Sequence, residues 1–223
     1  MNNFELAWHL VPLELWNTLY MVLVSGLFAF LIGFPLGITL VATGKGGVHP
    51  LPWLHHLLGI VVNIGRSLPF AILIVAVFPF TRLIIGTSIG TTASIIPLTI
   101  AAVPFMARVI ESALKEIPKT MIEAAFVMGA SKRQIVWMVL VPEAMPSLVQ
   151  AVTLTFVNLV GYSAMAGLVG GGGLGKIAIQ DGYQRFNGFL LLVTLILILL
   201  LVELIQWMGN GITYSIRRKR GLI

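Results

Sequence analysis

The residues whose spacing comes nearest to a catalytic motif are the glycines and the lysine of GGGGLGKI, Gly170 to Ile177. A phosphate-binding loop has the pattern G-x-x-x-x-G-K-[ST], in which backbone N–H groups and the lysine hold phosphates and the hydroxyl holds Mg²⁺. Ile177 replaces the hydroxyl residue, and no buried strand precedes the segment. We therefore expect no nucleotide site here, and predict that the glycines allow tight turning and close helix packing.

The other residue types that could perform chemistry are scattered. The sequence contains no Cys, which excludes disulfides and thiolate ligands. The four His residues lie outside the central apolar runs and have no acid at ligand spacing, and no nucleophile is paired with a base. The sequence therefore predicts no catalytic residue and no metal site. The histidines are His9, His49, His55 and His56.

Two charged residues interrupt apolar segments, where a charge is costly and calls for a partner or a function. For Arg66, we favour a structural role, either snorkelling to the interface or pairing with an acid. Glu203 could pair with a basic residue, stay protonated or face a polar cavity. We assign it no transport role.

The composition is that of an integral membrane protein. Of 223 residues, 58% are hydrophobic and only 10% are charged, whereas soluble domains carry about 25% charged residues. Lys and Arg outnumber Asp and Glu by 14 to 8, but the basic residues lie between apolar runs, which indicates membrane topology rather than nucleic-acid binding. The N-terminal segment has no basic residue before its apolar run, so we expect no cleaved signal peptide.

Five apolar stretches are long enough to cross a bilayer, since a spanning helix needs about 20 mostly apolar residues. Arg66 and Pro69 interrupt the second, and small polar residues open the third, whose helix should begin near Ser88. The longest polar insert is 111–146. The expected spans of this all-α integral membrane protein are 19–41, 57–80, 88–110, 147–169 and 186–214.

The distribution of Lys and Arg predicts the orientation, because cytoplasmic loops are enriched in both. With the C-terminus inside, five spans place residues 1–14 outside and the basic tail 217–223 inside. Eleven of the 14 basic residues then lie on the inner side. The three outer ones are Arg82, Lys176 and Arg185. We therefore expect an N-out/C-in topology.

Within the polar insert, local signals predict a small helical hairpin. Thr120-x-x-Glu123 and Ser131-x-x-Gln134 each match a capping box, in which the first side chain caps a helix and the second reaches back. Gly129 lies between them as the expected left-handed helix stop. Two interpretations remain open: an interfacial helix whose Lys132 and Arg133 meet lipid phosphates, or a docking element for a cytoplasmic partner.

The same stretch resembles the EAA loop of bacterial ABC importer permeases, whose pattern is E-A-A, a Gly after three further residues, and a distant Ile-x-Leu-Pro. Conservative replacements occur only in the distant part. The matching residues are Glu123, Ala124, Ala125, Gly129 and Pro142, with Val139 and Val141 in place of Ile and Leu.

The resemblance implies a type I ABC importer permease fold over residues 15–216, in a bacterial cytoplasmic (inner) membrane. In that family the loop is a coupling helix seated in a cleft of the ATP-hydrolysing subunit. The resemblance also implies a homodimer, two ABC ATPase subunits and an extracytoplasmic binding protein. This chain would bind no cofactor, and ATP and Mg²⁺ would belong to the ATPase. The implied docking residues are Glu123, Ala124, Ala125, Gly129, Ala130 and Ser131.

Longer strings resemble the methionine importer permeases more narrowly, and this resemblance implies transport of L- and D-methionine. The alternatives are another small amino acid or organic solute, or an ATPase-independent secondary transporter. A secondary transporter would leave the EAA-like loop unexplained. The strings are NIGRSLPFAILIVAVFPFTRLIIGTSIG, PLTIAAVPFMARVIESALKEIP and LVGYSAMAGLVGGGGLGKIAIQDGY.

A candidate gate lies in the fourth span, in LVGYSAMAGLVG. Small residues allow helices to approach closely, and a flexible Met among them could close a narrow pore. Ordinary packing between helices is the alternative. The candidate residues for the translocation path are Tyr162, Ser163 and Met165.

Overall fold

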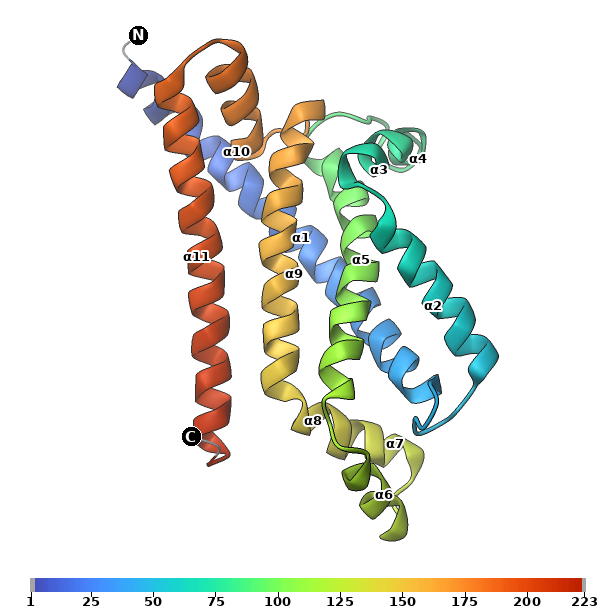
Figure 1. Cartoon of the computed structure of the whole chain (residues 1–223). Helices are drawn as coiled ribbons and strands as arrows, with labels where there is room; N and C mark the ends of the chain where they lie inside the picture. The colour runs from blue at the N-terminus through green and yellow to red at the C-terminus, as the bar shows by residue number, and fades with distance from the viewer. Residues whose placement is uncertain (1–2, 222–223) are drawn as a thin grey trace. The chain divides into compact units, whose positions relative to one another are not determined.

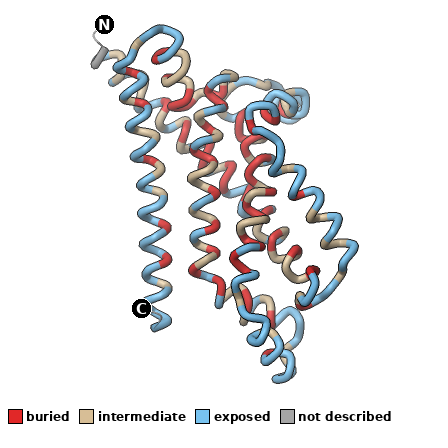
Figure 2. Tube along the Cα trace, viewed as in Figure 1, coloured by how far each residue is buried: buried red, intermediate tan, exposed pale blue. Residues whose placement is uncertain are grey.

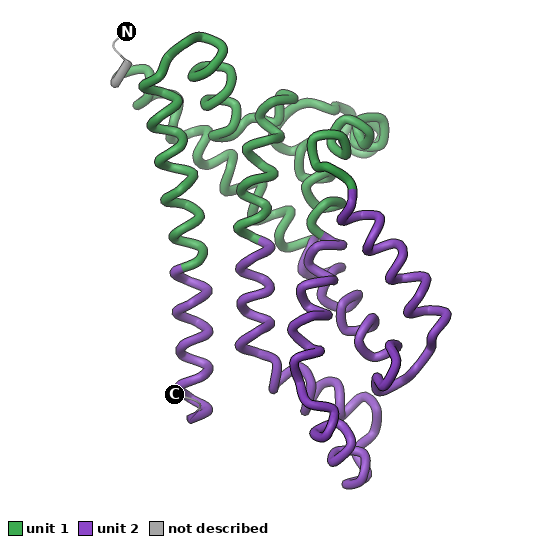
Figure 3. Tube along the Cα trace, viewed as in Figure 1, with its two compact units in different colours: residues 1–28, 68–102, 156–206 green, residues 29–67, 103–155, 207–223 purple. Residues whose placement is uncertain are grey.

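The computed structural model describes residues 3–221, which form helices joined by short loops, with no strand within that range (Figure 1). The chain divides into two compact units, coloured separately in Figure 3. Unit 1 comprises residues 1–28, 68–102 and 156–206, and unit 2 comprises residues 29–67, 103–155 and 207–223. Each long helix begins in one unit and ends in the other, since its residue range crosses a unit boundary.

Four helices are long and apolar enough to cross a membrane within the described part of the chain. Their ends differ from the expected spans by a few residues or more, because each continues into its polar flanks. Gly90, with φ of 110°, delays the start of the third expected span to Thr91. The four are α1 (Asn3–Thr43), α5 (Thr91–Lys115), α9 (Met145–Ala166), which a 3₁₀ turn (Gly167–Val169) extends, and α11 (Gly188–Lys219).

The second expected span, 57–80, differs most from expectation because it is not one continuous helix. Helix α2 (Pro52–Ser67) ends just before Pro69, and α3 (Phe70–Ala76) leaves at an angle of 102°. Pro69 is extended, with φ −60° and ψ 128°, and the residue before a proline is disfavoured in helical conformation. A third short helix, α4 (Phe78–Ile85), follows and ends at left-handed Gly86. The two pieces count as a fifth span only if a bent pair crosses the membrane together.

The remaining elements are short and belong to the polar segments. In unit 2, the insert forms α6 (Lys119–Val127), α7 (Lys132–Gln134), a π-helical segment (Ile135–Leu140) and α8 (Val141–Glu143). Figure 1 shows α6 and α7 beyond the ends of α5 and α9 that belong to this unit. In unit 1, the glycine-rich loop leads into α10 (Gly173–Lys176) and a π-helical segment (Ile177–Gln184).

Burial differs strongly between the spanning helices, as Figure 2 shows. In the most apolar stretch of α5, 56% of residues are buried, against 17% in that of α11. Along α5, small residues let neighbouring helices approach: a Cβ at Gly37 would lie 2.7 Å from the Ala107 carbonyl oxygen. Helix α11 instead exposes large apolar side chains over most of its length, which suits contact with lipid or with another membrane helix.

Candidate functional site

The polar insert folds into the expected helical hairpin, and glycine makes its turn. Gly129 has φ of 83°, a region that L side chains adopt poorly. The Ala130 N–H donates to the Ala125 carbonyl (3.0 Å), and the Gly129 N–H donates to that of Phe126 (2.9 Å). This pair of bonds is a Schellman motif, so Gly129 is the left-handed helix stop that the sequence predicted.

The two predicted capping boxes differ in outcome. At Ser131, the Gln134 N–H donates to the serine Oγ (3.4 Å), and the Ser131 N–H donates to Gln134 Oε1 (2.8 Å), which confirms the box. At Thr120 the prediction is wrong, because α6 begins at Lys119 and no side chain caps it. Pro118 is already extended and serves as the N-cap, which places Thr120 inside the first turn.

The hairpin is anchored to the spanning helices by one apolar cluster in unit 2. Ala125 is buried and belongs to the same cluster as Ile110 and Leu114 of α5, and as Ile135, Leu140 and Leu148 further along the chain. An alanine here lets α6 approach without a large side chain between the elements. A displacement of the hairpin would therefore act directly on the adjoining ends of α5 and α9.

The opposite side of the hairpin is exposed and largely apolar. Val127 and Met128 are 88% and 80% exposed, and Phe126 is exposed beside them. Glu123 and Ala124 are exposed, and Glu123 forms no ion pair with any residue in 3–221. Adjacent exposed apolar side chains of this size commonly mark a contact with another protein or with a membrane.

The three gate candidates lie close together on α9, but their side chains have different surroundings. Tyr162 stacks on Phe70, with ring centroids 4.6 Å apart. Ser163 is buried and donates its hydroxyl to the Val160 carbonyl of its own helix (2.8 Å). Met165 is 46% exposed, and one turn earlier Gly161 has open space where a Cβ would stand. Met165 therefore presents a large flexible side chain on an exposed face of unit 1, whereas Ser163 is occupied within α9.

The glycine-rich loop of unit 1 is closed by the chain itself. The Gly173 N–H donates to Glu14 Oε2 (2.7 Å), and the Lys176 ammonium pairs with Glu14 Oε1 (2.8 Å). The next amide, of Leu174, donates to Thr18 Oγ1 (2.8 Å). The donors that a phosphate would use are thus bound to α1. Residue types alone did not indicate that Glu14 pairs with Lys176. The signal in the sequence was the position of Glu14, an acid at the edge of an apolar span.

A second buried acid, Glu111 on α5, was not singled out from the sequence. Its carboxylate pairs with Arg108 Nη1 and Lys115 Nζ, both at 2.6 Å, and Arg108 Nη2 donates to Asn63 of α2. The spacing of three and four residues is the one at which side chains of a helix meet. Arg66 and Glu203 are exposed, and neither forms an ion pair with another residue in the described range.

Comparison with known proteins identifies the kind of protein in which this arrangement occurs. Residues 33–212 match the family described as "Binding-protein-dependent transport system inner membrane component". A relative from Vibrio cholerae serotype O1, a probable D-methionine transport system permease protein (MetI), is 51% identical over 209 residues, which are 94% of this chain and 93% of the relative.

Two solved structures are similar to this chain over nearly its whole length. A chain of the MetNI methionine ABC transporter in inward-facing conformations aligns with a TM-score of 0.93 and 48% identity, covering 97% of this chain and 99% of that one. An amino acid ABC transporter with histidines aligns with a TM-score of 0.69 at 17% identity, covering 92% of each chain, and this likeness concerns the fold alone.

Proposed function

Because this chain belongs to the family of binding-protein-dependent transport system inner membrane components, we propose that it is the permease subunit of an ATP-driven importer of methionine. The relatives that support the substrate carry D-methionine transport or a methionine ABC transporter in their descriptions. Both isomers of methionine are the proposed cargo. The chain performs no catalysis: two copies form the pathway in the inner membrane, two ATPase subunits hydrolyse ATP, and an external binding protein delivers the substrate.

The observation that carries this proposal is the hairpin of α6 and α7. It exposes Phe126, Val127 and Met128 on one side and buries Ala125 in a cluster with α5 residues on the other. An element with this arrangement is suited to bind an ATPase and to transmit its movement to the pathway. Glu123, Ala124, Ala125, Gly129, Ala130 and Ser131 are the proposed docking residues, of which Ala125, Gly129 and Ser131 set the shape and Glu123 and Ala124 lie at the surface.

The transport cycle follows from this connection. Closure of the ATPase pair on ATP would move the two hairpins, and the packed ends of α5 and α9 would move with them. Rigid-body movement of helices about an interface is a common way to open one side of a pathway and close the other. Hydrolysis would then reset the inward-facing state.

The proposed membrane topology is five spans, N-out and C-in, with the bent pair α2 and α3 counted as one. Residues 1–14 are then external, with α1 beginning within this segment at Asn3, and 217–223 are internal. Single cysteines in this Cys-free chain test it: Lys132→Cys should react only from the cytoplasm and Tyr183→Cys only from outside. Both positions are exposed, whereas Asp181 is buried and paired with Arg185. Labelling of Lys132→Cys from outside in intact cells would contradict the topology.

For the gate, we propose that Met165 faces the two-fold axis of the dimer, with Tyr162 and Ser163 fixing the local shape of α9. Its exposure in the single chain and the open space at Gly161 support this assignment. Met165→Cys in both copies should form a disulfide across the dimer in the resting state. Absence of that cross-link, with unchanged flux through Met165→Ala, would leave Met165 as a packing residue.

The function is tested at Gly129, where conformation and size can be separated. No atom lies within 4 Å of the position where a Cβ would stand, so a side chain has room and only the positive φ resists it. Gly129→Asn should retain transport, since Asn tolerates the left-handed region, whereas Gly129→Val should lose it. The measurements are methionine uptake and methionine-stimulated ATP hydrolysis in reconstituted complexes of equal subunit composition.

The matched control is the double variant Lys132→Ala plus Arg133→Ala, which removes two charges from the hairpin and leaves the turn intact. If the hairpin docks an ATPase by its shape, this variant keeps most of both activities. If the hairpin is a lipid-binding element, the double variant is the one that fails and Gly129→Val is tolerated. Normal coupling in Gly129→Val would contradict the proposed function of the hairpin.

A further inference from the structure

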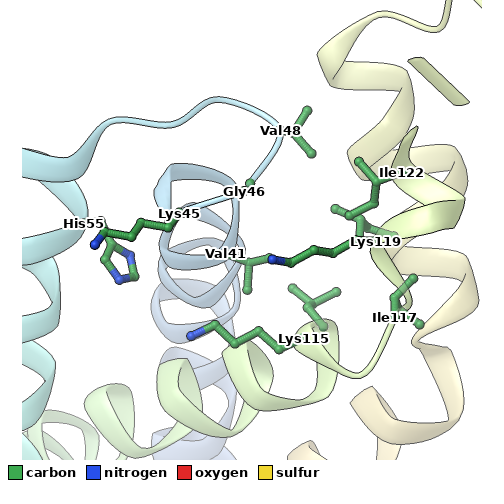
Figure 4. A pocket seen from close by; sticks show the side chains of 13 residues that line it. Val41, Lys45, Gly46, Val48, His55, Lys115, Ile117, Lys119 and Ile122 are labelled. Carbon is green, nitrogen blue, oxygen red and sulfur yellow. The ribbon is translucent and has the colours of Figure 1, made fainter. Parts of the chain in front are cut away.

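A pocket of about 340 Å³ lies in unit 2 where α1 ends, beside the start of the hairpin of α6 and α7 (Figure 4). One wall is the loop after α1 together with His55 of α2, and the other is the end of α5 with the start of α6. Figure 4 shows Lys115 and Lys119 extending toward the side on which α1 ends. None of the functional assignments above uses this pocket.

The pocket has an excess of positive charge. The side chains of Lys45 and Lys119 form no hydrogen bond or ion pair with any residue in the described range, and both are exposed. Lys115 is bound to Glu111, but that single carboxylate also serves Arg108. Three lysines and one histidine line the pocket, and no acid does.

Backbone geometry adds to this preference for an anion. Gly46 has φ of 77°, and a Cβ there would lie 3.2 Å from Lys119 Nζ, so the glycine leaves space for the ammonium. Among the described residues, the amides of Lys45 and Gly46 have no hydrogen-bond acceptor. Successive free amides in a turn form an anion-binding concavity in many proteins.

The remainder of the lining is apolar, which restricts the kind of anion. Val41, Ile117 and Ile122 are partly buried, and Leu114 and Leu140 are buried. Trp53, exposed on the first turn of α2, is a residue type enriched at the surfaces of bilayers. A ligand that satisfies both parts carries a phosphate and an apolar body.

We propose that this pocket binds the phosphate headgroup of an anionic phospholipid, one per permease subunit. Basic pockets between membrane helices are a known form of headgroup site. Lys45 and Lys119 contact the phosphate, and the apolar side chains contact the glycerol and the first methylenes of the chains. Because Lys119 and Ile122 belong to α6, a bound lipid holds the start of the hairpin of α6 and α7 against the end of α1.

The test is native mass spectrometry of the permease–ATPase complex with phosphatidylglycerol or phosphatidylcholine added to the detergent. The wild-type complex should retain one phosphatidylglycerol per permease subunit and much less phosphatidylcholine. Lys45→Gln plus Lys119→Gln should weaken this retention roughly 25-fold, since each basic residue contributes roughly a factor of five toward an anionic lipid. The matched control, Arg218→Gln plus Lys219→Gln, removes the same charge from the basic tail and should retain the lipid.

Four outcomes would overturn the proposal. Equal retention of the two lipids by the wild-type complex would show that the anionic headgroup is not recognised. Unchanged phosphatidylglycerol retention in the Lys45→Gln plus Lys119→Gln complex would exclude this pocket as the lipid site. Loss of the ATPase from that complex, but not from the control complex, would indicate that the two lysines bind the partner protein instead. Full displacement of the lipid by millimolar glycerol phosphate would indicate that the pocket binds a soluble phosphate rather than a lipid headgroup.

Discussion

The hairpin turn at Gly129 and the segment 170–175, a loop that leads into α10, both depend on glycine, yet their surroundings are opposite. At Gly129, a Cβ would meet no atom within 4 Å, and large apolar side chains beside it are exposed. At Gly175, a Cβ would lie 2.6 Å from Ala164 Cα, and the neighbouring amides are bound to Glu14 and Thr18. The first turn leaves its surface free for a partner, whereas the second is completed by its own chain.

This difference separates two reasons for a glycine that the sequence alone does not distinguish. Gly129 is needed for its backbone conformation, and Gly175 for the absence of a side chain. The contrast predicts that substitutions in the loop of unit 1 act on stability, while those in the hairpin act on coupling.

Gly175→Ala should have the largest effect on stability. The added methyl overlaps backbone atoms of Ala164, which cannot move aside as the end of a side chain could, so the cost should be about 3 kcal/mol or more. Gly129→Ala should cost only about 1 kcal/mol, from its positive φ. Thermal unfolding of the two purified variants in the same detergent measures the difference, and equal midpoints would refute the distinction.

Glu14→Ala should have the next largest effect. It leaves the buried Gly173 N–H without its acceptor, at a cost of about 2 kcal/mol, and removes the partner of Lys176. The corresponding acid of the hairpin, Glu123, is exposed, so Glu123→Ala should change stability by less than about 0.5 kcal/mol. A larger loss in Glu123→Ala than in Glu14→Ala, measured by the same unfolding assay, would reverse the comparison.

Ser131→Ala should have a smaller effect than Gly175→Ala or Glu14→Ala, about 1 kcal/mol, because it removes one half of a capping box. Thr120→Ala is its control: Thr120 does not cap α6, so its loss should be close to neutral. Hydrogen exchange of the amides in α6 and α7 measures each helix separately. Equal increases in exchange in the two variants would mean that Thr120 caps after all.

The parts of the hairpin that were predictable from the sequence are those that depend on near neighbours. The Gly129 stop and the Ser131 box each involve residues within five positions, so local patterns were sufficient. Thr120 failed because two local signals competed and Pro118 started the helix first. The pairing of Glu14 with Lys176 joins residues 162 positions apart, and only the folded chain brings them together.

The spans show the same limit. Hydropathy located α1, α5, α9 and α11 because an apolar run is itself the signal. It did not predict the bend between α2 and α3, since both pieces are apolar and the direction after Pro69 is set by packing: Phe70 is buried and stacks on Tyr162 of α9. The interruption at Arg66 and Pro69 was visible in the sequence, but the angle was not.

The exposed side of the hairpin is expected to contact the ATPase, and a cross-link at Val127 tests this contact. The natural chain has no Cys, so Val127→Cys introduces a single thiol that a photoactivatable maleimide can label in the assembled complex. Leu83→Cys is the control, because Leu83 is 83% exposed, close to the 88% of Val127, but lies on α4 in unit 1. Illumination should join the permease to the ATPase from Val127→Cys and not from Leu83→Cys. No adduct from Val127→Cys in a complex that retains its ATPase, or equal adducts from both positions, would exclude a specific contact between this side of the hairpin and the ATPase.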